Sequence, residues 1–228
     1  MDSREMMTLS EVAEYLQLAQ RTVLRMAQRG EIPAAKIASQ WRFMRSLVRD
    51  WLVGQMQAFP SAEARGDVRP EQSLLPLGEV LRPELMTFDI KPGPKESILR
   101  RLSAPLLETG FAKDPSRLLN SLLERERMMT TAIGHGIAIP HPRRAITGMF
   151  SEPAIALGIC PEGTDFRAID DQLVHVFFLI CATRDEIHLR LMANVSWVAR
   201  QEGTIAKLRQ ASSPQEVASI VAECSPRS

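Results

Sequence analysis

Two uninterrupted apolar segments, AIALGIC at residues 154–160 and LVHVFFLICA at residues 173–182, constrain the fold of this chain more than any other feature. Continuous apolar runs of this length are typical of central strands that are covered on both faces. The two segments therefore predict the middle of a sheet that lies between helical layers.

Helical patterns surround these runs. One of them contains Pro105, which we expect to kink or shorten the helix. In KDPSRLLNSLLERER, Asp114 can cap a helix and Pro115 suits the first helical position. Further helices are predicted for EIHLRLMANVSWVAR, TIAKLRQA and SPQEVASIVAE, and a strand for LMTFDI. This order of elements predicts an α/β sandwich with a mixed central sheet over residues 74–224.

The N-terminal part, residues 1–56, has a different pattern. In TLSEVAEYL, Thr8 and Glu11 have the spacing of a capping box, which predicts the start of a helix. RTVLRMAQRGEIP predicts a second short helix that ends at Gly30 and Pro33. AAKIASQWRF alternates like a small hairpin, and SLVRDWL adds another helical stripe. The order predicts a small winged helix-turn-helix domain.

Basic residues are concentrated in this part, although the net charge of the whole chain is only +1. Residues 20–49 hold six arginines and one lysine against a single acid, Glu31, which favours a polyanionic partner. A helix fits the major groove of DNA, where arginine can donate to guanine, and cations on a wing neutralise phosphates. The predicted DNA-contacting residues are Gln20, Arg21, Thr22, Arg25, Lys36, Gln40 and Arg42.

A solvated basic face that docks another protein is the alternative for this part. Charge alone favours the alternative, whereas charge together with the helix spacing and WRF favours DNA. A single module of this size makes few contacts, so we expect a homodimer or higher oligomer that reads paired half-sites.

Residues 57–73, QAFPSAEARGDVRPEQS, separate the two parts. They are rich in proline, alanine, glycine and charge and show no sustained apolar period, which is typical of a linker. An ordered loop that lies on one domain is the alternative.

The segment GHGIAIPHPRR fixes a histidine between two prolines. Pro140 cannot donate to a strand ladder, and Pro142 favours an extended backbone at His141, so the imidazole is presented at a strand end. A neutral imidazole is a nucleophile, and Gly134 and Gly136 would let the backbone approach an anion bound to it. Cations suited to a phosphoryl group could come from Arg125, Arg127, Arg143 and Arg144.

Over residues 7–52 the chain resembles the excisionase and MerR-like winged helix-turn-helix family. The resemblance rests on TLSEVAEYL, RTVLRMAQRGEIPA and WRF in this order and spacing. Such modules often carry serine or threonine before the second helix, where this chain has Ala19, so we expect that helix to lack a side-chain cap.

LLERERMMTTAIGHGIAIPH is similar to the signature of enzyme IIA of the sugar phosphotransferase system, of the fructose/mannitol class, and of its nitrogen-regulatory relative. The similarity extends over residues 74–224 and includes EIHLRL. It implies that His141 is phosphorylated, that His188 orients it or binds the phosphate, and that Arg125 balances developing charge. Thr131 is a further candidate for a hydrogen bond to phosphate. The implied donor is an HPr-type carrier, and the family uses a covalent phosphohistidine with no metal or organic cofactor.

Two positions depart from that pattern. Pro142 stands where the family commonly has glycine, which removes a backbone N–H that could face the phosphate. His135 stands where the turn often carries asparagine, and it would add a titrating group beside the site. We expect His135 to be exposed and His175 to be a structural strand residue, and no pair of histidines has the spacing of metal ligands.

The chain has no apolar stretch of the roughly 20 residues that span a bilayer and no apolar signal segment at its start. We therefore expect a cytoplasmic protein without membrane insertion. Its three cysteines, Cys160, Cys181 and Cys224, show no metal-like pairing and are interpreted as reduced thiols.

The leading interpretation is a regulatory protein that accepts a phosphoryl group on His141 and couples this to DNA binding and transcription. It would be a phosphocarrier component rather than a turnover enzyme. Two alternatives stay open: a plain phosphocarrier or transport component whose N-terminal module contacts protein, and a DNA-binding protein whose IIA-like domain is not phosphorylated. Salt-dependent DNA binding and phosphoryl transfer separate the three.

Overall fold

The computed structural model describes residues 6–58, 77–168 and 170–224 of the 228-residue chain. The chain divides into two compact units, residues 1–61 and 62–228. Most of the linker predicted at residues 57–73 lies outside the described residues, and its first two residues continue a helix to Ala58. None of the helices in the described ranges is long and apolar enough to cross a membrane.

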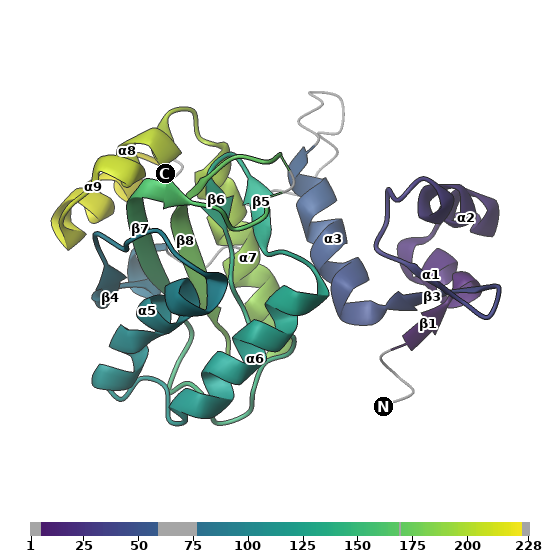
Figure 1. Ribbon diagram of the computed structural model, residues 1–228, viewed down its shortest axis with the longest axis horizontal. Coiled ribbons are helices and arrows are strands. Elements are labelled where there is room, and N and C mark those ends of the chain that lie inside the picture. The colour runs from purple at the N-terminus through teal and green to yellow at the C-terminus, as the bar shows by residue number, and fades with distance from the viewer. Residues whose placement is uncertain (1–5, 59–76, 169, 225–228) are drawn as a thin grey trace. The chain divides into compact units, whose positions relative to one another are not determined.

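The first helix of the N-terminal unit begins at the predicted capping box. The backbone N–H of Glu11 donates to Oγ1 of Thr8 at 3.3 Å, and the backbone N–H of Thr8 donates to the Glu11 carboxylate at 2.7 Å. Ala19 supplies no side-chain cap to the second helix, as expected. The unit contains β1 (Met6–Thr8), α1 (Leu9–Leu16), α2 (Gln20–Gln28), β2 (Ala35–Ile37), β3 (Gln40–Met44) and α3 (Arg45–Ala58) (Figure 1).

The predicted hairpin forms from β2 and β3, which pair antiparallel. Ala38 and Ser39 connect them with φ angles of 44° and 65°, the left-handed geometry that suits a two-residue hairpin turn. β1 pairs with the other side of β3, and its three residues are too few to show an alternating pattern in the sequence. Val12, Val23 and Phe43 are fully buried in the core of this unit, so the predicted winged helix-turn-helix architecture is confirmed.

A mixed five-stranded sheet forms the centre of the C-terminal unit, in the order β4-β7-β8-β6-β5. The two predicted central strands pair antiparallel as β7 and β8, whereas β4 lies parallel to β7 and β6 parallel to β8. The strands are β4 (Leu81–Thr87), β5 (Ala132–Gly134), β6 (Ile137–Ala138), β7 (Ala154–Thr164) and β8 (Val174–Cys181). The helices are α4 (Leu77–Val80), α5 (Lys95–Glu108), α6 (Pro115–Met128), α7 (Asp185–Arg200), α8 (Thr204–Gln210) and α9 (Pro214–Cys224).

Alternate residues of the central strands face two buried layers. On one face, Ala156 of β7 and Phe177 of β8 belong to a core with Leu102 of α5 and Leu122 of α6. The intervening strand residues, such as Phe178, are also buried, and α7 and α8 pack on that side of the sheet (Figure 1). Because both faces are covered, the predicted α/β sandwich with a mixed sheet is confirmed.

Two elements differ from the prediction in detail. β4 begins at Leu81, before the LMTFDI segment, and it ends before Phe88. Pro83 fits inside β4 because this is an edge strand, where a missing N–H can face away from the neighbouring strand. α5 runs through Pro105 to Glu108, because this proline lies in the last turn and removes a single intrahelical hydrogen bond.

Candidate functional site

Backbone hydrogen bonds hold the segment that leads from β6 to His141. The N–H of Ile139 donates to the carbonyl of Thr131 at 2.9 Å, and the carbonyl of Pro140 accepts from the N–H of Ile180 at 2.9 Å. β6 itself stops before Pro140, as predicted from the missing N–H. His141 therefore follows a well-anchored backbone, and it is only 2% exposed.

Two hydrogen bonds define the protonation of the His141 ring. Nδ1 lies 2.7 Å from the carbonyl oxygen of Ile139, an atom that can only accept. Nε2 lies 3.1 Å from Nε of Arg125, whose N–H can only donate. These partners require a neutral ring with its proton on Nδ1 and a lone pair on Nε2. Nε2 is thus the ring nitrogen whose lone pair is available for nucleophilic chemistry.

Arg125 lies in the last turn of α6 with its side chain buried. Its Nη1 donates to the carbonyl of Met129, just past the end of the helix, at 2.8 Å. Because a guanidinium is planar, this bond and the bond to His141 together fix its orientation. A fixed cation beside Nε2 suits an anionic group on that atom. Of the other basic residues named above, Arg127 and Arg144 are exposed and Arg143 is half-buried.

His188 reaches the same place from the first turn of α7. Its backbone N–H donates to the carbonyl of Arg184 at 3.0 Å, which anchors the start of the helix. The His188 and His141 rings meet edge to face, with centroids 4.9 Å apart and an interplanar angle of 62°. The structure therefore brings together His141, His188 and Arg125 from three separate elements.

The Thr131 hydroxyl is bonded to a buried carboxylate. Oγ1 of Thr131 donates to Oε2 of Glu126 at 2.6 Å, and the Thr131 N–H donates to the same oxygen at 3.0 Å. Oε1 of Glu126 accepts from Nζ of Lys95 at 2.5 Å. Sequence reasoning missed Glu126 and Lys95, because a charged helix end such as LLERER gives no sign that one of its carboxylates is buried.

The glycine turn does not reach His141. Gly134 and Gly136 flank His135 in the connection between β5 and β6, at the start of β6, whereas His141 follows its end. The backbone N–H of His135 donates to Oδ2 of Asp170 at 2.8 Å. The expectations that these glycines approach a bound anion and that His135 titrates beside the site are wrong, because the turn and His141 lie at opposite ends of an extended strand.

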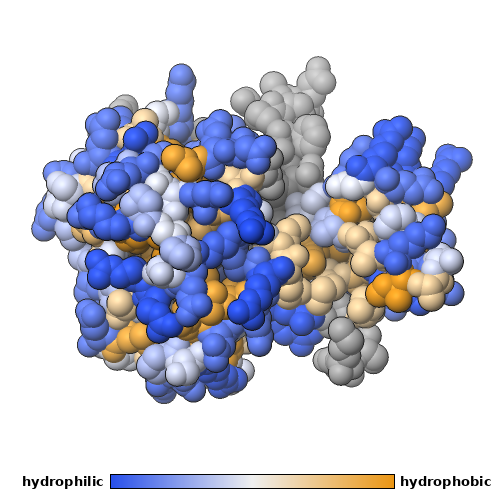
Figure 2. All heavy atoms as spheres, viewed as in Figure 1, coloured by the Kyte–Doolittle hydropathy of each residue, from blue (hydrophilic) through white to orange (hydrophobic). Residues whose placement is uncertain are grey.

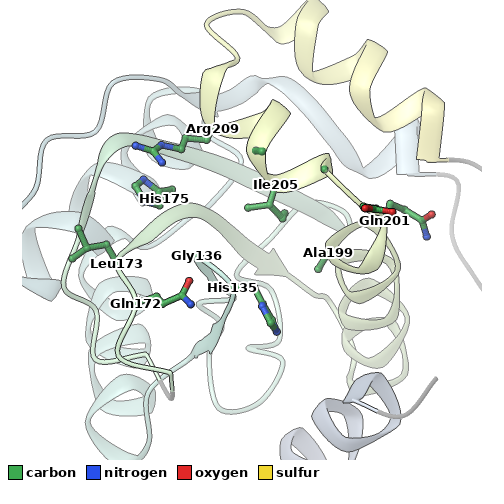
Figure 3. A pocket seen from close by; sticks show the side chains of 12 residues that line it. His135, Gly136, Gln172, Leu173, His175, Ala199, Gln201, Ile205 and Arg209 are labelled. Atoms are coloured by element: carbon green, nitrogen blue, oxygen red, sulfur yellow. The ribbon is translucent and has the colours of Figure 1, made fainter. Parts of the chain in front are cut away.

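A separate cavity of ≈ 660 Å³ opens at that end of β6 (Figure 3). Its wall combines the β5–β6 turn, the start of β8, and the ends of α7 and α8 that meet there. His135 is exposed beside it, as expected. His175 lines it from β8 with Nδ1 3.2 Å from the carbonyl of Cys160, the contact of a structural strand residue. Within the described ranges, no three His, Cys, Asp or Glu residues gather as a metal site requires.

The predicted DNA-contacting residues lie on the surface of α2 and the hairpin. Gln20, Arg21, Arg25, Lys36 and Gln40 are exposed, and Thr22 and Arg42 are half-buried. Three of these side chains also bond within the unit. Nε2 of Gln20 donates to Oγ of Ser10 at 3.1 Å, Nη1 of Arg42 donates to the carbonyl of Trp41 at 3.1 Å, and Nη2 of Arg42 donates to Oε1 of Gln40. Figure 2 shows that the surface over α2 is largely hydrophilic.

The fold and the site define an α/β domain that holds a buried histidine in contact with an arginine and a second histidine. Residues 79–224 match the family model described as "Phosphoenolpyruvate-dependent sugar phosphotransferase system, EIIA 2". The chain therefore belongs to the type 2 EIIA family of the phosphotransferase system. Residues 6–56 match a "Helix-turn-helix domain" model, so the N-terminal unit is a helix-turn-helix domain.

Relatives of the C-terminal unit come from both sugar and nitrogen systems. The "PTS system fructose-specific EIIA component" of Haloferax volcanii is 34% identical over 142 residues, which is 61% of this chain and 90% of that protein. The "Nitrogen regulatory protein" of Bradyrhizobium diazoefficiens is 29% identical over 155 residues, 65% of this chain and 95% of that protein. The crystal structure of nitrogen regulatory protein IIA-Ntr from Neisseria meningitidis superposes with a TM-score of 0.54 and 26% identity, over 63% of this chain and 97% of that one.

Proposed function

We propose that Nε2 of His141 accepts a phosphoryl group from the phosphohistidine of an HPr-type carrier protein. The observation that carries this proposal is the hydrogen bond from Nδ1–H to the Ile139 carbonyl, which leaves the lone pair on Nε2. That lone pair attacks phosphorus while the P–N bond to the donor imidazole breaks. The donor ring carries a proton on its other nitrogen, takes back the electron pair of the P–N bond and leaves as neutral imidazole. The proton on Nδ1 of His141 stays in place, so transfer requires no proton movement on this ring.

Arg125 and His188 support the charge that arrives with the phosphoryl group. The Nε–H of Arg125 already lies 3.1 Å from the accepting nitrogen, so small shifts would let the guanidinium donate to phosphoryl oxygens. The His188 ring, in edge contact with His141, restricts its rotation and can donate to the phosphate. The Thr131 hydroxyl donates its hydrogen to the Glu126 carboxylate rather than toward the phosphate, so the role of Thr131 is to bind that carboxylate.

Phosphoryl transfer from a phosphorylated HPr-type carrier to the full-length protein tests this role. Acid-labile label should appear on the parent protein and on His135→Ala, which removes an exposed histidine at the far end of β6. His141→Ala should take no label. A parent protein that stays unlabelled, with a carrier proved competent on another acceptor, would overturn the proposal.

We further propose that the helix-turn-helix domain binds duplex DNA, with α2 in the major groove and the β2–β3 hairpin on the phosphates, in a cytoplasmic transcription regulator. The exposed Arg21 and Arg25 of α2 and Lys36 of the hairpin support this placement. A module of this size makes few contacts, so a homodimer on paired half-sites fits it best.

Binding to a mixed-sequence duplex at several salt concentrations tests the DNA role. Lys36→Gln should lower the affinity. It should also reduce the slope of log K against log salt by about one, the contribution of one phosphate contact. Arg100→Gln, a matched loss of an exposed cation on α5 of the other unit, should change neither. No salt-dependent binding by the parent protein would favour a plain phosphocarrier whose N-terminal module contacts protein.

The two roles would be coupled through charge. A phosphoryl group adds about −1.5 to −2 charges at neutral pH, which is enough to change how a basic surface docks. DNA affinity should therefore differ between protein phosphorylated on His141 and unphosphorylated protein. Equal affinities would remove the coupling, and DNA binding without any phosphorylation would favour a DNA-binding protein with an inert IIA-like domain.

A further inference from the structure

Glu126 is a buried carboxylate that receives three hydrogen bonds. Its side chain is 4% exposed, and it forms an ion pair with Lys95 of α5. The N–H and the hydroxyl of Thr131 supply the other two hydrogen bonds. Three donors from two separate elements thus converge on one carboxylate directly beside Arg125 in the sequence.

Lys95 makes two further contacts. Nζ lies 4.7 Å from the centroid of the Phe166 ring and 3.4 Å from Oγ1 of Thr130. Oγ1 of Thr130 in turn donates to the carbonyl of Phe166 at 2.9 Å. The ion pair therefore ties the last turn of α6 to the start of α5, and the half-buried Lys95 cation depends on the Glu126 carboxylate for its charge balance.

Two lines of contact, made of hydrogen bonds and short backbone segments, lead from this carboxylate to the His141 ring. Along the first line, Glu126 holds Thr131, whose carbonyl accepts from Ile139, whose own carbonyl accepts from Nδ1 of His141. This line ends on the atom that sets the tautomer of the ring.

The second line ends on the opposite ring nitrogen. Glu126 fixes the backbone at Thr131, two residues after Met129, whose carbonyl accepts from Nη1 of Arg125. Nε of Arg125 donates to Nε2 of His141. Both hydrogen bonds that define the ring thus depend on the short segment of residues 129–131.

We propose that Glu126, held by Lys95, is a positioning residue for His141. It fixes residues 129–131, and through them both the carbonyl that keeps the proton on Nδ1 and the guanidinium that faces Nε2. The part of this proposal that concerns transfer rate rests on the proposed phosphoryl acceptor function. The part that concerns the ring tautomer does not.

The Glu126→Gln variant breaks this arrangement with little change of shape. A glutamine amide has one oxygen to accept hydrogen bonds, and its NH₂ group can only donate. Lys95 and Thr131 present three donors between them, so the NH₂ group must face one of them, and the Lys95 charge loses its partner. An NH₂ group that faces Thr131 breaks both hydrogen bonds of that residue, and one that faces Lys95 displaces the cation that contacts Thr130. In either orientation we expect residues 129–131 to shift.

Two readouts on the full-length protein test the role. The ¹⁵N chemical shifts of the His141 ring report which nitrogen carries the proton, and single-turnover labelling by the phosphorylated carrier reports the transfer rate. Glu126→Gln should give a mixture of tautomers and a transfer rate about 10²-fold lower at saturating carrier, the scale of loss expected for displacement by about 1 Å. The carrier concentration at half-saturation should stay the same, since the docking surface is untouched.

Glu223→Gln provides the matched control, because it removes the carboxylate of an exposed ion pair with Lys207 at the far side of the unit. It should leave both readouts at parent values. Lys95→Met/Glu126→Met removes both buried charges and leaves the two Thr131 donors without their acceptor. It replaces the single variant if that variant unfolds. It too should show a tautomer mixture and slow transfer.

The outcomes separate this proposal from the proposed function. A folded Glu126→Gln or double variant with the parent tautomer and the parent transfer rate would overturn the positioning role. A parent protein that takes no label but shows the tautomer change on substitution would overturn the phosphoryl acceptor function and uphold the positioning role.

Discussion

The Nε–H of Arg125 donates to Nε2 of His141 at 3.1 Å, on the ring nitrogen opposite the one whose proton is held by a backbone carbonyl. The arginine therefore already lies at the atom that a phosphoryl group would occupy. Its planar fork has further N–H groups that can bond phosphate oxygens without a new side-chain conformation. Two hydrogen bonds hold this buried guanidinium in place, so little reorganisation would be needed for it to pair with a phosphoryl group on His141.

Arg125→Lys should show that the fork matters as well as the charge. A lysine has one nitrogen and cannot bond both the Met129 carbonyl and the His141 ring in the arginine geometry. We expect phosphoryl transfer to fall about 10²-fold, the scale seen when one donor to developing charge is lost. The rate of label uptake at saturating carrier measures this. Arg100→Lys, an exposed arginine on α5, should transfer at the parent rate, and an equal rate for Arg125→Lys would refute the requirement.

The sequence predicted those elements whose signal is local. β7 and β8 were evident because both of their faces are buried, so their residues form continuous apolar runs. The start of α6 was evident because Asp114 caps it: Oδ1 of Asp114 accepts from the N–H of Arg117 at 3.0 Å. His141 and its two partners were expected together only through resemblance to a family, since no spacing rule brings them together.

The rest depends on contacts between residues distant in the sequence. Lys95 and Glu126 are 31 positions apart, and nothing near either residue indicates that the other will neutralise it. His135 was expected beside His141 because the two are close in sequence, but it precedes β6 whereas His141 follows that strand. Short strands such as β1 likewise form only because a partner strand is present.

Gly163→Ala should destabilise the C-terminal unit more than a matched glycine substitution. Gly163 has a φ of +76°, and a Cβ there would lie 2.5 Å from the His175 ring. Gly110 has a similar φ of +69° but nothing within 4 Å, so Gly110→Ala isolates the backbone strain. We expect the difference between the two variants to be about 1–3 kcal/mol, the usual cost of overpacking. Urea unfolding followed by amide signals of β8 measures it, and equal losses would show that the His175 ring moves aside freely.

The cysteine thiols should be protected in the native protein. Burial raises the pKa of Cys160 and Cys181, so less of the reactive thiolate forms at a given pH. An aromatic disulfide reagent at pH 8 should therefore react slowly with native protein, while all three cysteines react after unfolding in urea. Because the folded protein holds these protons more tightly, their contribution to stability is complete below the ordinary thiol pKa of about 8.5 and is lost as pH rises above it. Rapid reaction of native protein would contradict the burial.

Ala19→Ser should stabilise the helix-turn-helix domain by supplying the cap that α2 lacks. The Ala19 backbone has φ −66° and ψ 140°, the extended geometry of an N-cap residue, and Ala19 is exposed, so a serine hydroxyl fits there. Its oxygen can accept from a backbone N–H of the first turn, and the expected gain is about 1 kcal/mol.

Hydrogen exchange of the α2 amides in the full-length protein measures this gain, because it reports the opening of this helix separately from the C-terminal unit. Ala19→Val is the control, since valine suits the same extended backbone but has no oxygen to accept a hydrogen bond. The serine variant should exchange more slowly than the valine variant throughout the first half of α2. If the two variants exchange at the same rate, the missing cap does not limit the stability of α2, and the packing of Val23 and Ala27 into the core sets it instead.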